Sequence, residues 1–234
     1  MRFFRLGLVL LGAATMVACQ SPQHVELAKP LKREAGQSRI LLMPTDVELQ
    51  ELTAGGVLEP KADWTEAAKK HLAAALREQE SARKLRLVDY DEASGSAERR
   101  EELHQLFKLY AAVGYGIFNH QFSGPLQLPT KAKGFDWSLG PAMQALREQY
   151  GADYALLTFV RDSYSSAGRQ ALKIVAALAG VGVAGGRQVG FTSLVDLETG
   201  DIVWFNRIIK TTGDLRDADG ARATAVELLA GFPQ

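Results

Sequence analysis

The sequence has a single cysteine and no excess of either charge. One cysteine, Cys19, excludes a disulfide within the chain and any metal site made of several cysteines. Lys and Arg number 27, as do Asp and Glu, and this balance argues against a nucleic-acid-binding protein, which would carry a basic excess. With 22 glycines and 8 prolines in 234 residues, the chain is neither fibrous nor of low complexity. It is long enough to bury one large core or two small ones.

The motifs of common catalytic and metal sites are also missing. The histidines have neither H-x₃-H nor H-E-x-x-H spacing, and the chain contains no G-x-S-x-G. Residues 180–185 match G-x-G-x-x-G, but the residues from Arg187 onward predict a strand, whereas a dinucleotide site needs a helix there. We therefore predict no metal, no cofactor and no enzymatic activity. The four histidines are spread along the chain: His24, His71, His104 and His120.

A cluster of acidic residues offers one candidate for acid–base chemistry. Asp46, Glu48 and Glu51 alternate with apolar residues just after a predicted strand, and paired carboxylates can act as general acid and base. A hydrolase that uses these carboxylates is kept as an alternative. Acidic residues in such a stretch more often form a solvated loop edge, so this alternative is the weaker one.

The amino terminus has the layout of a secretory signal. Arg2 and Arg5 precede the uncharged residues 6–18, in which an apolar run from Leu6 is followed by mostly small residues. A helix of 13 residues is about 20 Å long, which is short of the roughly 30 Å core of a bilayer. A cleavable signal is therefore favoured over a permanent transmembrane anchor.

Cys19 follows Met16-Val17-Ala18 directly, and here the sequence resembles the bacterial lipoprotein signal. The resemblance implies cleavage after Ala18 and acylation of Cys19, for example with palmitate, although Met16 stands where leucine is usual. Gln20, rather than Asp, implies transfer to the outer membrane. An ordinary signal peptide with a chance cysteine is the alternative, but it leaves a free thiol unexplained in an oxidising compartment.

The rest of the chain predicts a single α/β domain with a mixed sheet of about five strands and helices packed on it. Residues 1–18 are the predicted signal peptide, 19–37 a flexible tether, and 38–234 the folded periplasmic domain. Loops are expected at 45–61 and 114–134. Strands are predicted at 39–43, 84–88, 152–160, 188–197 and 201–209, and helices at 63–81, from 97, at 136–150 and at 218–230.

Two segments of the second half carry a further resemblance. Residues 150–157 read YGADYALL and residues 193–204 read SLVDLETGDIVW. They resemble a group of bacterial envelope lipoproteins that includes the curli secretion-channel lipoprotein, the penicillin-binding-protein activators and the ring of exopolysaccharide export. The group shares its fold with the amino-terminal domain of the Tol-Pal translocation protein. The structural positions in the two segments are Gly151, Asp196, Gly200 and Trp204.

The resemblance implies a non-enzymatic, lipid-anchored outer-membrane protein that faces the periplasm. Such a protein would act as an adaptor or assembly component of an export, polysaccharide or cell-wall system. Its partners would be the outer membrane, through the anchor, and another envelope protein or further copies in a ring. The alternative is an oligomeric subunit of an outer-membrane secretion pore, with residues 165–188 in the bilayer.

One uncharged segment, residues 174–186, fits no motif. It is too short to span a membrane as a helix, and it lacks the alternation of a barrel wall. Three interpretations stay open: a helix or loop packed on the sheet, a self-association face of small residues, and a membrane contact. The residues concerned are Ile174, Val175, Leu178, Gly180, Val181, Gly182, Val183 and Gly185.

Overall fold

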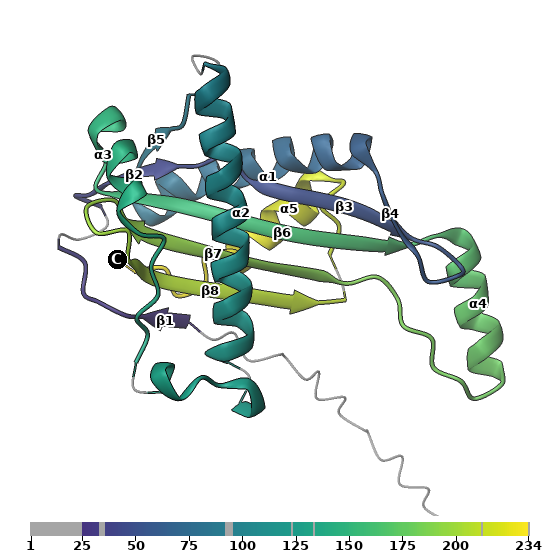
Figure 1. Cartoon of the computed structure of the whole chain (residues 1–234). Coiled ribbons are helices and arrows are strands. Elements are labelled where there is room, and N and C mark those ends of the chain that lie inside the picture. Colours follow the sequence, from purple (N-terminus) through teal and green to yellow (C-terminus); the bar gives the residue numbers. More distant parts are fainter. Residues whose placement is uncertain are drawn as a thin grey trace, which may run out of the picture.

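A mixed sheet runs through the centre of the molecule (Figure 1). The computed structural model describes residues 25–32, 36–91, 96–122, 124–132, 134–211 and 213–233. Its main strand order is β1-β8-β7-β6-β2-β5, with β3 beside β6 and β4 beside β3. The strands are β1 (Val25–Leu27), β2 (Arg39–Leu42), β3 (Asp46–Leu52), β4 (Leu58–Pro60), β5 (Arg86–Asp89), β6 (Tyr154–Ser165), β7 (Gln188–Asp196) and β8 (Ile202–Lys210).

Helices cover both faces of the sheet. One face packs against α1 and α5, and the other against α2 and the region of α3 (Figure 1). This arrangement confirms the predicted mixed α/β sheet in one body, with β1 and the β3–β4 hairpin added to the five predicted strands. The α-helices are α1 (Ala62–Arg83), α2 (Ala97–His120), α3 (Gln144–Tyr150), α4 (Ala167–Leu178) and α5 (Ala218–Leu228). Three short 3₁₀ turns occupy Gly124–Leu126, Pro129–Lys131 and Pro141–Met143.

β6 is the strand on which the two cores meet. On one side it pairs in parallel with β2 and then with β3, and on the other it pairs antiparallel with β7 along its length. Tyr154, Leu156 and Val160 enter the core of α1 and α5, whereas Ala155, Leu157 and Phe159 enter the core of α2. Because both faces are buried, the strand reads as a continuous apolar run.

α2 crosses the sheet face at very short range. A Cβ on Gly114 would lie 2.1 Å from a ring carbon of Phe191, so only glycine fits there. One turn earlier, the Tyr110 hydroxyl donates to the carbonyl of Leu157 at 2.9 Å. The prediction of irregular structure from residue 114 is therefore wrong as far as residue 120, because packing on the sheet outweighs the low helix propensity of glycine.

Two other predicted boundaries are corrected by the structure. The expected loop at 45–61 contains β3, whose Asp46 and Glu48 lie 2.9 and 3.7 Å from the Arg161 guanidinium on β6. Those ion pairs let an acidic segment form a strand with its apolar residues facing the core. The helix expected at 136–150 is α-helical only from residue 144, since Gly140 has a φ of +80° and Pro141 begins a 3₁₀ turn.

We predict that Gly114→Ala lowers the free energy of unfolding by about 1–3 kcal/mol, because the added methyl group overpacks α2 against Phe191. Gly168→Ala is the matched control, since its Cβ would lie at an ordinary 3.4 Å from Ala54. Urea denaturation measures both. Equal stability of the two variants would contradict the close helix–sheet contact.

Candidate functional sites

The first site is formed by the segment before the folded domain. Residues 25–32, called the strap from here on, lie inside the predicted tether, yet β1 pairs antiparallel with β8. The amide of Ala28 extends this ladder by donating to the carbonyl of Val203 at 2.9 Å. Leu31 packs against the core of α1 and α5. The strap therefore covers part of the edge of β8, which an unstructured tether would leave unpaired.

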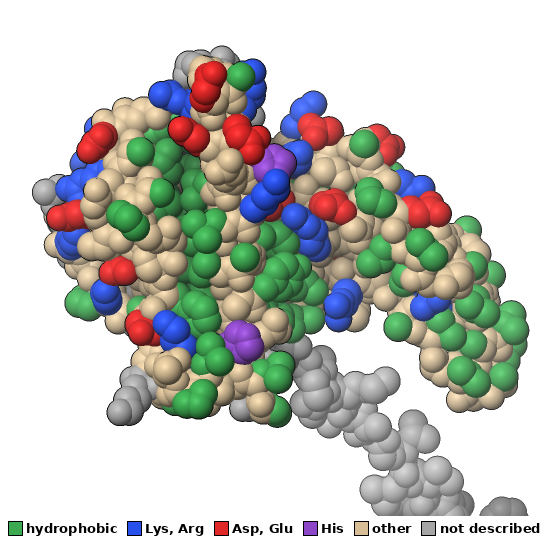
Figure 2. Space-filling view, viewed as in Figure 1, with side chains coloured by type: hydrophobic (Ala, Val, Ile, Leu, Met, Phe, Trp, Pro, Cys, Tyr) green, Lys and Arg blue, Asp and Glu red, His purple; other side chains and the backbone are tan. Residues whose placement is uncertain are grey.

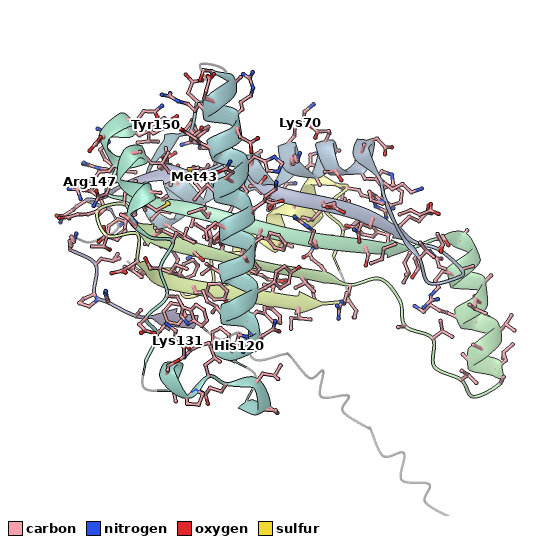
Figure 3. All side chains as sticks on the ribbon, in the orientation of Figure 1. Met43, Lys70, His120, Lys131, Arg147 and Tyr150 are labelled. Atoms are coloured by element: carbon pink, nitrogen blue, oxygen red, sulfur yellow. The ribbon has the colours of Figure 1, made fainter. Side chains whose placement is uncertain are left out.

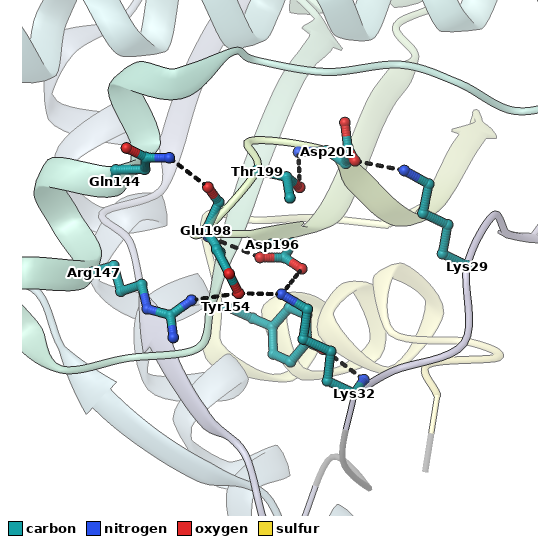
Figure 4. A network of polar contacts seen from close by, with 9 residues as sticks. All are labelled: Lys29, Lys32, Gln144, Arg147, Tyr154, Asp196, Glu198, Thr199 and Asp201. Atoms are coloured by element: carbon teal, nitrogen blue, oxygen red, sulfur yellow. Dashed lines mark hydrogen bonds and ion pairs between the residues drawn. The ribbon is translucent and has the colours of Figure 1, made fainter.

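Two lysines fasten the strap to the β7–β8 hairpin (Figure 4). Lys29 Nζ lies 2.5 Å from Asp201 Oδ2, and Lys32 Nζ lies 3.0 Å from Asp196 Oδ2. Lys32 also pairs with Glu198. The hydrogen bond from Lys32 is the main cause that lowers the pKa of the Glu198 carboxyl below its usual range. The positive charges of the strap thus face negative charges on the hairpin.

The hairpin owes its shape to the residues that carried the resemblance. Asp196 is 6% exposed, and its Oδ1 accepts the amide hydrogen of Glu198 at 2.8 Å. Gly200 has a φ of +78°, and a Cβ there would lie 2.0 Å from the carbonyl oxygen of Gly140. Trp204 is fully buried on the core face, and Gly151 ends α3 with a φ of +58°. Asp196 thus both shapes the turn and holds Lys32.

The structure adds residues that the sequence did not indicate. Arg147 on α3 lies 2.9 Å from the Glu198 carboxylate, and the Tyr154 hydroxyl accepts the amide hydrogen of Lys32 at 3.0 Å (Figure 4). Lys29 and Lys32 stand in a polar stretch whose partners lie more than 120 residues away along the chain. No local pattern could have revealed these pairs.

We predict that Lys32→Glu loosens the strap, because it places like charges against Asp196 and Glu198. Amide hydrogens of residues 25–32 should then exchange on the order of fivefold faster, which corresponds to about 1 kcal/mol. Lys70→Glu, on the solvent side of α1 (Figure 3), is the charge-matched control and should leave the strap unchanged. Identical amide hydrogen exchange of residues 25–32 in the two variants would show that the ion pairs of Lys32 do not stabilise the strap.

The second site is an arm that projects from the strand ends. The arm comprises residues 166–187: α4 and the segment that returns to β7 (Figure 1). It contains every residue of the uncharged segment. Leu178 is 86% exposed, Ile174 65%, Val175 64% and Val181 56%, and Figure 2 shows hydrophobic side chains gathered there. The interpretation of this segment as packed on the sheet is therefore wrong.

The glycines of the arm lie beyond and beside α4. Gly180 has a φ of +74° and reverses the chain after the helix, while nothing lies within 4 Å of the Cβ position of Gly182. Val183 and Gly185 are half-buried on the return segment. Residues 180–185 thus follow a helix and precede β7, the opposite of the order that a dinucleotide site needs.

The base of the arm is fixed by polar contacts. The Arg169 guanidinium donates to the carbonyl of Ala184 at 2.9 and 3.0 Å and to that of Ala54 at 3.3 Å. The Ser166 hydroxyl caps α4 by accepting the amide hydrogen of Arg169 at 3.1 Å. The helix is therefore tied to its own return segment and to the turn between β3 and β4.

A polar cavity of about 410 Å³ lies at the base of the arm. Asp162, Gln188, Lys173 and Arg187 are among its lining residues. The Asp162 carboxylate is 3% exposed and accepts from the Tyr164 hydroxyl at 2.5 Å and from Gln188 Nε2 at 2.6 Å. Burial raises the pKa of Asp162 above its ordinary value, because desolvation outweighs these hydrogen bonds.

This raised pKa predicts a pH dependence. The stabilisation from protonated Asp162 is complete below the ordinary aspartate pKa and is lost as pH rises through the raised one. Asp162→Asn keeps an acceptor for Tyr164 and Gln188, so it should lose less stability than the wild type as pH rises above the ordinary aspartate pKa of about 4. Urea midpoints measure the difference, with exposed Asp63→Asn as control. If the stability of Asp162→Asn fell with pH as steeply as that of the wild type, Asp162 would not be the source of the pH dependence.

The acidic candidates near β3 are held in ion pairs. Glu51 lies 2.8 Å from Lys61, and Asp46 and Glu48 face Arg161. The described residues contain no group of three or more His, Cys, Asp or Glu side chains arranged to hold a metal ion. None of their helices is both long and apolar enough to cross a bilayer. Cys19 and Ala18 lie outside the described residues.

The chain is similar to several solved structures at low identity. No family model and no curated protein matches it. The PelC dodecamer from Paraburkholderia phytofirmans matches at 12% identity and a TM-score of 0.40, covering 91% of this chain and 99% of that one. The LpoB C-terminal domain from Salmonella enterica matches at 16% identity and a TM-score of 0.29, covering 77% of this chain and 87% of that one. Lipoprotein GNA1162 from Neisseria meningitidis matches at 12% identity and a TM-score of 0.32, covering 82% of this chain and 94% of that one. What this chain does must therefore be inferred from its own residues.

Proposed function

We propose that this chain is a lipid-anchored protein of the bacterial outer membrane that faces the periplasm. The observation that carries the proposal is Cys19, the only cysteine, placed directly after Ala18 at the end of a short apolar segment. In this proposal the signal is removed after Ala18, and acyl chains on Cys19 hold the domain at the membrane. Each buried CH₂ group contributes about 0.8 kcal/mol, so several chains anchor the protein stably.

The domain acts as a non-enzymatic adaptor or assembly component of an envelope system. The arm supports this role, because it exposes large apolar side chains on a base that Arg169 holds in place. Apolar surface of this kind marks a contact with a membrane or with another protein. The arm is thus proposed as the surface through which the anchored domain meets the membrane, another envelope protein or a second copy.

A subunit of a secretion pore is the second candidate. The exposure of residues 174–181 favours it, since that segment is accessible to lipid. Its conformation weighs against it: Ile174, Val175 and Leu178 lie on a 12-residue helix, about 18 Å long, rather than on alternating strands of a barrel wall. The adaptor is therefore the function that we favour.

We predict that Cys19→Ala removes the protein from outer-membrane fractions while the domain still folds. Intact mass spectrometry of the wild type should show a chain that begins at an acylated Cys19. Gln20→Asp is the matched variant: it keeps the acylation but should hold the protein in the inner membrane. An unmodified sulfur or an intact Met1 in the wild type would refute the proposal, as would full retention of Cys19→Ala in the outer membrane.

A further inference from the structure

The direction of β1 shows which end of the sheet the amino-terminal side of the strap faces. β1 is antiparallel to β8, with Val25 opposite Asn206, so the amino-terminal end of β1 points toward the Lys210 end of β8. Lys210 pairs with Gln188, and Gln188 pairs with Asp162 near the end of β6. The arm projects from this same end of the sheet (Figure 1). The amino-terminal end of β1 and the arm therefore face the same end of the sheet.

The strap also limits the distance between the anchor and the domain. Only five residues separate Cys19 from Val25, and the six steps between these two residues cover about 3.4 Å each in a fully extended chain, or about 20 Å in all. From Asn206 to the end of β8 at Lys210 takes four residues, or about 14 Å. A Cys19 held in a membrane thus brings that surface close to the end of the sheet where the arm begins.

The chemistry of the arm fits a lipid surface of negative charge. The sequence has no Asp or Glu between Asp162 and Asp196, but it has Arg169, Lys173 and Arg187 there. α4 carries Arg169 and Lys173 together with its exposed apolar residues. A helix with an apolar face flanked by cations binds at the interface of a bilayer with anionic lipids.

We infer that the arm lies in the membrane interface beside the acyl chains of Cys19, with Leu178 and Val181 among the lipid tails and Lys173 and Arg187 at the anionic headgroups. The inference rests on the proposed anchoring at Cys19. It names the lipid bilayer as the partner of the arm, and it gives the domain a fixed orientation with the β7–β8 hairpin away from the membrane.

Fluorescence on vesicles tests this orientation. The only native cysteine is acylated in this proposal, so a cysteine introduced by Leu178→Cys is the single free thiol for an environment-sensitive dye. Glu148→Cys on α3, beside the β7–β8 hairpin, is the control at the opposite end. The full-length lipidated protein is placed on vesicles of phosphatidylethanolamine and phosphatidylglycerol. We expect a lipid-borne quencher to reduce the emission from position 178 at least threefold more than that from position 148.

Other outcomes overturn the inference. Equal access of a water-soluble quencher to both positions would show that the arm lies in water. A blue shift at position 178 that grows with protein concentration in detergent would show that a second copy covers it. The double variant Lys173→Glu, Arg187→Glu should weaken lipid quenching on vesicles that contain phosphatidylglycerol but not on vesicles of neutral lipid. An equal effect on both kinds of vesicle would rule out the contact with anionic headgroups. Labelling of wild-type Cys19 by the dye would instead show a free thiol, so the proposed anchoring itself would have failed.

Discussion

The burial of β6 on both of its faces is the constraint on which the other contacts depend. Its twelve residues meet β2, β3 and β7 through backbone hydrogen bonds and meet two helical layers through their side chains. A shift of one residue in its register would exchange the side chains of its two faces and would therefore disrupt both cores. The hydrogen bond from Tyr110 on α2, the Arg161 pairs with β3 and the polar cavity at Asp162 all involve residues of this one strand.

The sequence predicted those elements whose signal is local. The segments that form β2, β6, β7 and β8 are largely apolar and become buried strands. β5 was predicted from the alternation of residues 84–88, and none of its four residues is buried. β3 was not predicted because its acidic residues form ion pairs with Arg161, which lies more than 100 residues later in the chain. The last two turns of α2 were not predicted because Gly114 and Gly116 suggest a break. Their contacts with Phe191 on β7 and with Trp137, which no local pattern shows, explain why glycine stands there.

The candidate sites divide in the same way. The turn of the β7–β8 hairpin was visible in Asp196 and Gly200, since an Asx turn and a positive φ are local requirements. The use of that hairpin to hold Lys29 and Lys32 was not visible, because ion pairs across the fold leave no periodic pattern. The uncharged segment at 174–186 was visible as unusual, yet its exposure is a property of the tertiary structure alone.

The lysine contacts of the strap have a mechanical consequence. Both lysines are more than half exposed, so their attraction to the hairpin is screened as the salt concentration rises. If the strap detached, 18 residues would lie between Cys19 and Ser38, and the 19 steps between these two residues would cover about 65 Å in a fully extended chain. With Cys19 as the proposed anchor, loss of these ion pairs together with the β1–β8 backbone pairing would thus make the connection between anchor and domain about three times as long.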